Sequence, residues 1–222
     1  MVNLNNITFA YNSKKIFYST YVNINEGEFV FIVGESGIGK TTLLKLIYFD
    51  LKPQRGIIKT LQYNSDLIDY SEIPLLRRQI GVVFQDFKLL NDRNVYENIA
   101  MPLYISGEKG ESVRKKVYNT ASAFGIFDSL KLMPYDISGG EQQRVCIARA
   151  MIIEPKIFIA DEPTGNLDPF VSSEIFKLIN EINMKGTTCI VATHNFEIVR
   201  KYQSKRILQI KDNKLYDVRI KT

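Results

Sequence analysis

Cysteine, histidine and tryptophan are nearly absent from this chain of 222 residues, which has two cysteines, one histidine and no tryptophan. Two cysteines cannot form a zinc-binding cysteine set, which argues against a zinc-dependent binding domain. Cys146 and Cys189 lie in a helix-like and a strand-like apolar stretch. This context predicts two reduced core residues in a reducing compartment.

Long apolar runs are also missing. No stretch approaches the roughly 20 apolar residues that span a bilayer, and the N-terminus lacks the basic and apolar segments of a secretory signal. The sequence contains no repeat and no low-complexity segment, and its length suffices for one α/β domain with a helical insertion. We therefore expect a cytoplasmic protein.

The formal net charge of +5 restricts the function only weakly. A basic chain could bind an anionic membrane surface or nucleic acid. However, basic pairs such as Arg77-Arg78 and Arg200-Lys201 are dispersed along the sequence, which is typical of solvated faces. No nucleic-acid partner is expected.

A glycine-rich loop lies between a predicted strand, 28–33, and a predicted helix, 41–49. Its glycines let backbone N–H groups point at phosphate oxygens, while Lys40 brings a positive charge and Thr41 a hydroxyl for Mg²⁺. The helix N-terminus favours an anion further. A chance match of a glycine-rich turn is the less favoured alternative. The predicted nucleotide-binding residues of the loop are Gly34, Glu35, Ser36, Gly37, Ile38, Gly39, Lys40, Thr41 and Thr42.

Two acids follow a second apolar strand, 157–160. Open α/β sheets bind ligands at this end of their strands. Asp161 could hold Mg²⁺ through water, and Glu162 could polarise a water molecule for attack on a γ-phosphate. Alone, the acids would be better interpreted as solvated residues at an ordinary strand end. Beside a phosphate loop, they predict a site of hydrolysis.

A second anion-binding helix end is predicted at Ser138. This residue is a good N-cap, and Gly139 and Gly140 leave backbone N–H groups open to a ligand. One phosphate loop needs only one such helix end. Residues 137–144 resemble the signature motif of the ATP-binding-cassette (ABC) ATPase family, with Glu141 at a position where glutamine is usual.

The resemblance to the ABC ATPase family covers essentially the whole chain. It implies an α/β fold: a P-loop NTPase (RecA-like) core, an N-terminal antiparallel β subdomain and a helical subdomain that carries the signature. It implies ATP hydrolysis with Mg²⁺ held by Thr41, Gln85 and Asp161. It also implies a head-to-tail homodimer, in which the signature closes the nucleotide site of the partner subunit through Ser138, Gly139, Gly140 and Glu141.

Four other positions match motifs of this family. Gln85 resembles the Q-loop glutamine, which senses the γ-phosphate and Mg²⁺, and Asp168 resembles the D-loop residue at the dimer interface. His194 follows an apolar strand and resembles the switch histidine that contacts the γ-phosphate. The implied catalytic residues are thus Glu162, His194 and Gln85. Tyr11 lies where the family stacks an aromatic ring on adenine, although the aromatic residues near it could all belong to the core.

A narrower resemblance, in residues 42–48, 83–90 and 95–99, is to the FtsE family of bacterial cell-division ATPases. It implies an FtsX-like transmembrane partner, control of cell-wall hydrolases, and a position on the inner face of the cell membrane through that partner. In the family, the segment after the Q-loop glutamine lines a groove for a helix of the membrane subunit. We therefore expect Phe87 and Leu89 to be partly exposed.

Two alternatives remain open. One is the ATPase of a lipoprotein-release or macrolide-export complex, which is the same enzyme on a different membrane subunit. The other is a soluble ABC ATPase that acts on nucleic acid or ribosomes. The absence of a coiled-coil insertion, a zinc-binding cysteine set and a second cassette argues against the latter.

The remaining segments predict a helical insertion in an alternating α/β chain. Residues 94–152 are assigned to the helical subdomain, interrupted at Ser106-Gly107 and Met133-Pro134, and residues 1–93 and 153–222 to the core with the β subdomain. The other predicted elements are short strands within 1–25, a helix at 71–79, strands at 81–84 and 188–192, a helix at 170–184, and a hairpin at 207–220 that turns at Asp212-Asn213.

Overall fold

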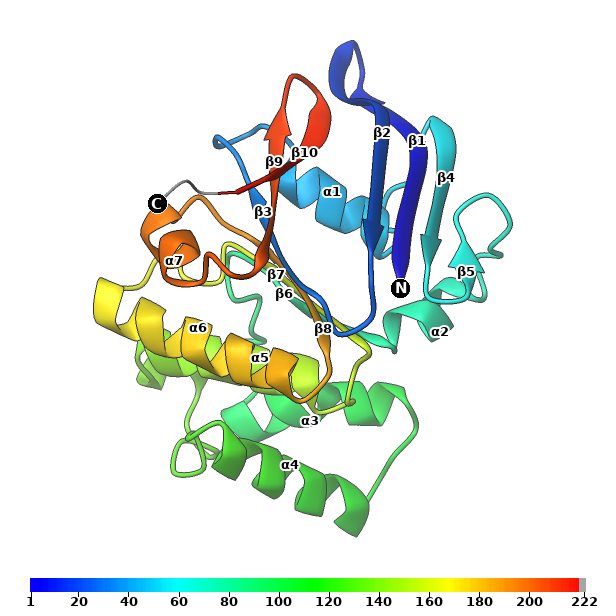
Figure 1. Cartoon of the computed structure of the whole chain (residues 1–222). Helices are drawn as coiled ribbons and strands as arrows, with labels where there is room; N and C mark the ends of the chain where they lie inside the picture. Colours follow the sequence, from blue (N-terminus) through cyan, green and yellow to red (C-terminus); the bar gives the residue numbers. More distant parts are fainter. Residues whose placement is uncertain (220–222) are drawn as a thin grey trace.

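The computed structural model describes residues 1–219, whose strands form two sheets (Figure 1). The smaller sheet is antiparallel and has the order β2-β1-β4-β5. Its strands are β1 (Val2–Tyr11), β2 (Lys14–Ile24), β4 (Arg55–Thr60) and β5 (Tyr63–Asn64).

The larger sheet has the order β10-β9-β3-β8-β7-β6, and all its pairs except β9–β10 are parallel. Every residue of β3, β7 and β8 is buried, as expected for parallel strands that are covered on both faces. The order matters for the site, because it places the ends of β3, β8 and β7 next to one another. The strands are β3 (Phe29–Val33), β6 (Ile80–Val83), β7 (Ile157–Asp161), β8 (Thr188–Ala192), β9 (Arg206–Lys211) and β10 (Lys214–Val218).

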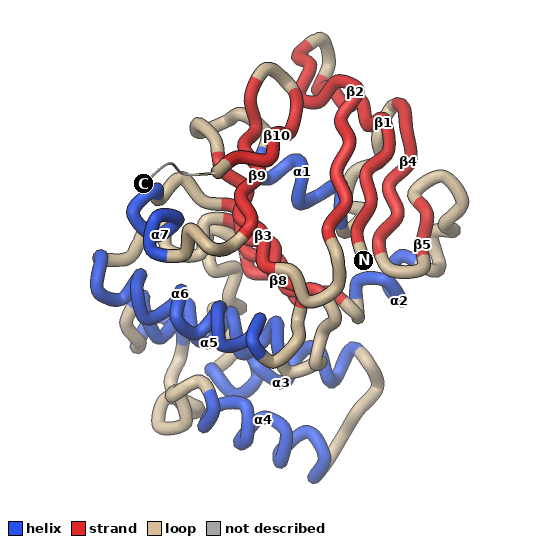
Figure 2. The backbone as a smooth tube through the Cα atoms, viewed as in Figure 1, coloured by secondary structure: helices blue, strands red, loops and turns tan. Residues whose placement is uncertain are grey.

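Helices cover both faces of the larger sheet (Figure 2). Helix α1 lies between the two sheets, whereas α5 and α6 lie on the opposite face, with α3 and α4 beyond them (Figure 1). The helices are α1 (Lys40–Ile47), α2 (Ile73–Arg77), α3 (Val95–Ile105), α4 (Glu111–Ala123), α5 (Gly139–Met151), α6 (Pro169–Met184) and α7 (Phe196–Lys201), and a 3₁₀ turn spans Pro134–Asp136.

Three clusters of buried apolar side chains follow these layers. The first joins α1 to both sheets, and the second joins α5, α6 and α7 to the other face of the larger sheet. The third is formed mainly by α3, α4 and α5, with Val95, Leu103, Val117 and Val145 among its members. The helical segment therefore has a core largely of its own.

Most of the elements expected from the sequence are present in the structure, with differences in length and some omissions. The breaks at Ser106-Gly107 and Met133-Pro134 are confirmed, because α3 ends at Ile105 and only a 3₁₀ turn precedes α5. The helix predicted at 71–79 is shorter, and β4 and α7 were not predicted. The hairpin turns at the expected place, and its last predicted residue, Ile220, lies outside the described residues.

The contact between α6 and the larger sheet gives a stability prediction. Phe176 is fully buried, and its ring centroid lies 6.0 Å from that of Phe31 on β3. Phe176→Ala should lower the free energy of unfolding by about 3–5 kcal/mol, because it removes buried area and leaves a cavity. Urea unfolding would measure this. Phe170→Ala is the matched control, since Phe170 lies in the first turn of the same helix but is 75% exposed. Equal effects of the two substitutions would contradict the packing of Phe176 between α6 and the larger sheet.

Candidate active site

A pocket of about 380 Å³ lies where the loops after four parallel strands converge. These loops follow β3, β6, β7 and β8, so the pocket is at the carboxyl end of the sheet, where open α/β sheets bind ligands. Its lining residues are Tyr11, Lys14, Ile16, Ser36, Gly37, Gly39, Lys40, Thr41, Thr42, Gln85, Asp161, Glu162 and His194.

The phosphate loop has a backbone that only glycine adopts without strain. Gly37 and Gly39 have φ angles of 74° and 121°. A Cβ atom on Gly39 would lie 2.5 Å from Cγ2 of Ile16, whereas one on Gly37 would meet no atom of the described residues within 4 Å. The loop curls around Lys40, whose Nζ donates to the carbonyl oxygens of Gly34 (3.0 Å) and Glu35 (3.2 Å). Lys40 is consequently buried at the base of the pocket.

Glu162 links three strand ends through one carboxylate. Its Oε1 lies 3.2 Å from Lys40 Nζ, and its Oε2 accepts from the backbone N–H of His194 (3.1 Å) and lies 2.9 Å from His194 Nδ1. Its own N–H donates to the carbonyl oxygen of Ala192 at 2.9 Å. Glu162 adopts a left-handed backbone, with φ 47°, which turns the chain sharply after β7. Both carboxylate oxygens are thereby occupied by partners.

Asp161 differs from Glu162, because one of its carboxylate oxygens is left without a partner among the described residues. It is buried, and its Oδ1 has no hydrogen-bond partner among residues 1–219. Burial raises the pKa of Asp161, and the charge of Glu162 raises it further, while a hydrogen bond from Thr41 opposes the shift. A buried orphan carboxylate oxygen beside a threonine hydroxyl offers the hard oxygen ligands that Mg²⁺ prefers. With Gln85 lining the same pocket, the residues present fit a magnesium ion.

The far side of the pocket is formed by the turn between β1 and β2. Tyr11 is 44% exposed and packs edge-on against Phe9, with ring centroids 5.0 Å apart. Its accessible ring is compatible with stacking on a base. Lys14 and Ile16 line the pocket beside it and were missed from the sequence. Their residue types gave no signal, because Lys14 comes beside Tyr11 only through the direct pairing of the two residues across the hairpin.

The other predicted residues lie elsewhere. Gly34, Glu35 and Ile38 belong to the loop but do not line the pocket, and the four signature residues and Asp168 do not line it either. Asp168 caps α6 instead, accepting from the N–H groups of Phe170 (2.9 Å) and Val171 (3.0 Å).

The signature residues begin α5 with a capping box. Ser138 Oγ accepts from Glu141 N–H at 3.3 Å, and Glu141 Oε2 accepts from the N–H (3.0 Å) and hydroxyl (2.7 Å) of Ser138. Ser129 Oγ donates to the other carboxylate oxygen of Glu141 at 2.7 Å. These hydrogen bonds lower the pKa of Glu141, and the one from Ser129 has the largest effect. Ser138 is exposed at this helix end.

Comparison with known proteins identifies the family. Residues 19–165 match the ABC transporter family. The cell division ATP-binding protein FtsE of Bacillus subtilis (strain 168) is 45% identical over 96% of this chain and 93% of its own length. FtsE of Escherichia coli (strain K12) is 40% identical over 97% of both chains. A solved dimeric structure of the ATP-binding cassette MJ0796, in a post-hydrolysis state bound to ADP and Pi, superposes with a TM-score of 0.87 at 33% identity, covering 100% of both chains.

The glycines of the phosphate loop give a test of the pocket geometry. Gly39→Ala should lower the free energy of unfolding by about 1–3 kcal/mol more than Gly37→Ala, because both carry left-handed strain but only the former clashes with Ile16. Chemical unfolding of both variants would measure the difference. Ile16→Ala removes the clashing methyl group and should recover part of the loss in the Gly39→Ala background. No recovery would mean that Ile16 does not limit position 39.

Proposed function

The chain belongs to the ABC transporter ATPase family, and we propose that it is the ATP-hydrolysing subunit of an FtsE-like cell-division complex, acting as a head-to-tail dimer on an FtsX-like transmembrane partner. One observation carries the proposal. Among the described residues, the pocket is lined by part of the phosphate loop, both acids, Gln85 and His194, but by no residue of the signature. The second anion-binding helix end is therefore left for a nucleotide outside this pocket.

ATP binding begins with an exchange of partners at Lys40. The β- and γ-phosphates compete with Glu162 for the ammonium group, which the ion pair already holds next to the loop. Backbone N–H groups of the loop and of the start of α1 take the remaining phosphate oxygens. Tyr11 stacks on the adenine ring, and Lys14 and Ile16 lie beside the nucleoside.

Release of Lys40 frees Oε1 of Glu162 to act on water. That oxygen accepts a hydrogen bond from the attacking water molecule and then its proton. The other oxygen stays with His194, which keeps the carboxylate oriented and brings the imidazole to the γ-phosphate. A Mg²⁺ ion, when held by Thr41, Asp161 and Gln85, would neutralise charge on the phosphate oxygens.

Dimerisation completes the site. Ser138 and the N–H groups of Gly139 and Gly140 would meet the γ-phosphate bound by a second copy, with Glu141 holding Ser138 in place and Asp168 at the interface. Residues 94–152 then act as a subdomain that carries the signature. Loss of the γ-phosphate removes the charge that holds the two copies together, so hydrolysis yields motion.

Glu162→Gln separates these steps. The variant should bind ATP but lose at least about a hundredfold in turnover, because an amide cannot accept the proton. It should also form a dimer with ATP and not with ADP. Steady-state hydrolysis and light scattering across concentrations measure the two effects, with Glu111→Gln on α4 as the control. Near-normal turnover would eliminate Glu162 as the base, and equal masses with both nucleotides would contradict the γ-phosphate-dependent dimer.

A groove beside Gln85 supports the membrane partner. A hollow of about 380 Å³ between α2, β6, α3 and α5 is lined mainly by apolar groups, including Pro74, Ile80 and Ile105. A second hollow, of about 510 Å³, includes Phe84 and Gln85 and shares Arg77 and Val82 with the first. It also shares Thr41, Gln85 and Asp161 with the nucleotide pocket. A helix seated here would act on the Q-loop directly.

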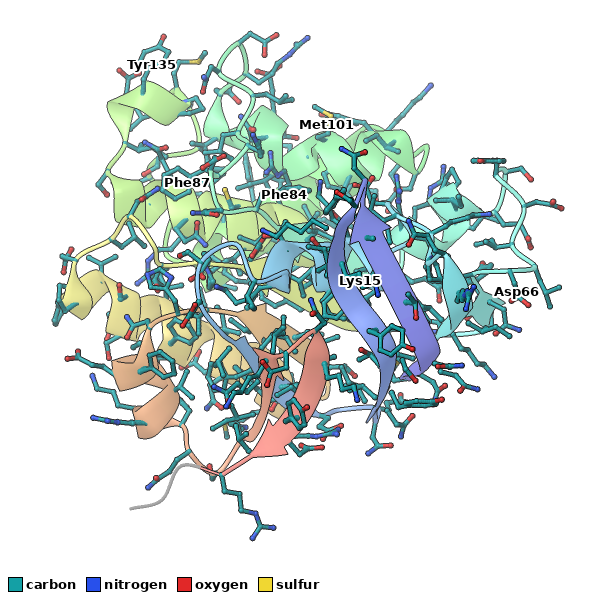
Figure 3. The ribbon with its side chains drawn as sticks, turned by 90° about the horizontal axis from the view of Figure 1, so that it is seen from above. Lys15, Asp66, Phe84, Phe87, Met101 and Tyr135 are labelled. Atoms are coloured by element: carbon teal, nitrogen blue, oxygen red, sulfur yellow. The ribbon has the colours of Figure 1, made fainter. Side chains whose placement is uncertain are left out.

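The side chains that face this groove differ from those singled out in the sequence. Phe87 and Leu89 are partly exposed, as expected, but they also pack against the second and third core clusters. Phe84 is 38% exposed and Ile105 is 62% exposed. Figure 3 shows Phe84 and Phe87 where the green helical segment meets the rest of the chain. Phe84 and Ile105 are therefore the better probes of docking, since their replacement does not disturb a core.

The double variant Phe84→Asp, Ile105→Asp should lose its membrane subunit, because docking would bury two carboxylates without partners. Co-purification from membranes measures recruitment, and nucleotide binding by the free protein should stay unchanged. The matched control replaces Leu67 and Tyr70, which are also exposed and lie outside the groove, with Asp.

Wild-type recovery of the membrane subunit with the groove variant would overturn the docking site. Cells that carry it should show a division or cell-separation defect. If they instead mislocalise lipoproteins, the partner is an export subunit and the cell-division role is wrong.

A further inference from the structure

The segment that follows Gln85 has an unusual backbone. Phe87 and Lys88 are consecutive non-glycine residues with positive φ angles, 55° and 50°. Each such residue costs free energy, so a pair persists only where surrounding groups hold it. The same turn directs the carbonyl groups of both residues toward α5, the helix that begins with the signature.

Arg149 on α5 supplies the holding contacts. Its guanidinium donates to the carbonyl oxygen of Lys88 at 2.8 Å and to that of Phe87 at 3.0 Å. The thiol of Cys146, one turn earlier on α5, donates to the same Phe87 oxygen at 3.0 Å. Arg149 is half-buried and forms no ion pair within residues 1–219, so its charge is directed to the carbonyl groups of this loop and, more weakly, to Asn98.

The strand that precedes Gln85 also packs against α5. Gly81 on β6 lies so close to α5 that a Cβ atom there would be 2.5 Å from the carbonyl oxygen of Ala150. Residues 81–88 therefore contact α5 twice: Gly81 lies against Ala150, and the carbonyl groups of residues 87–88 bind Arg149. Gln85 lies between these two contacts along the chain. Gln85 itself is exposed and lines both the nucleotide pocket and the neighbouring hollow.

Farther along, Asn98 on α3 holds the end of the segment. Its side chain is fully buried, accepts from the N–H of Leu90 at 2.8 Å and donates to the Leu90 carbonyl at 3.1 Å. The loop is therefore fixed to helices of the third core cluster along its whole downstream half. Among the described residues, no side chain from outside the loop forms a hydrogen bond or ion pair with residues 84–86, where Asp86 pairs only with Lys88 of the same loop.

We propose that Arg149 is a positioning residue for hydrolysis: by binding the carbonyl groups of Phe87 and Lys88, it sets the loop so that Gln85 faces the nucleotide pocket. The inference rests on the proposed role of Gln85 in holding Mg²⁺. It adds that the position of Gln85 is fixed to the helix that presents the signature, so the two move together.

A double-mutant cycle with Gln85→Ala tests this. Arg149→Lys keeps the charge but cannot bridge two carbonyl groups with one planar fork, and Arg149→Met removes the donors. Each should lower kcat about tenfold, the equivalent of one or two hydrogen bonds, while ADP affinity changes less than about twofold because the phosphate loop follows another strand. In the Gln85→Ala background, either substitution should lower kcat by less than about twofold. Arg93→Lys is the control, since that side chain pairs with Glu97.

A readout that is independent of turnover is amide hydrogen exchange of residues 84–90, which should quicken in Arg149→Met and not in Arg93→Lys. If Arg149→Met does not fold, Cys146→Ala serves in its place, because it removes one donor to Phe87 and should show a smaller loss of the same kind.

The outcomes are distinct. Independent effects, in which the Arg149 and Gln85 losses multiply, would overturn the positioning role, as would unchanged exchange in the loop. A normal Gln85→Ala enzyme would instead remove the proposed role of Gln85 itself.

Discussion

The ion pair between Lys40 and Glu162 is the interaction on which the site depends. Both groups are buried, so each charge requires the other until a substrate offers an alternative. The pair can form only because β8 lies between β3 and β7 in one sheet, which brings the ends of the three strands together. β8 also delivers His194 to the second oxygen of Glu162. Lys40, Glu162 and His194 are thus preassembled by strand order, in a contact that a phosphate bound at Lys40 would have to break.

The parts of the site that could be predicted from sequence are those whose chemistry is local. The glycines of the phosphate loop, Lys40, and the acids after an apolar strand could be assigned to one site from their own residue types and spacing, and all of them except Gly34 line one pocket. The buried strands β3, β7 and β8 could be predicted for a related reason, since burial on both faces leaves a continuous apolar run. Lys14 could not be found in this way, because its place beside the pocket depends on the β1–β2 register.

Other features depend on partners distant in the chain. β4 is a short run whose strand character comes from pairing with β1, and nothing in residues 55–60 alone indicates that pairing. The family resemblance after Gln85 predicted that Phe87 and Leu89 are partly exposed, but not that they also face the core. Their orientation depends on the left-handed turn at residues 87–88, which is bound by a helix some 60 positions later. Local patterns therefore located residues that line one pocket, while long-range contacts determined which neighbouring side chains face the pocket and the groove.

The three residues common to the nucleotide pocket and the adjoining hollow, Thr41, Gln85 and Asp161, have a thermodynamic consequence. An occupant of the groove that favours one arrangement of these side chains alters the affinity for ATP by some factor, and ATP must alter the affinity for that occupant by the same factor. The affinity for the occupant of the groove and the affinity for nucleotide are then two measurements of one coupling free energy. The ratio of ATP to ADP in the cell would therefore set the affinity of this subunit for the occupant of the groove, even before ATP is hydrolysed.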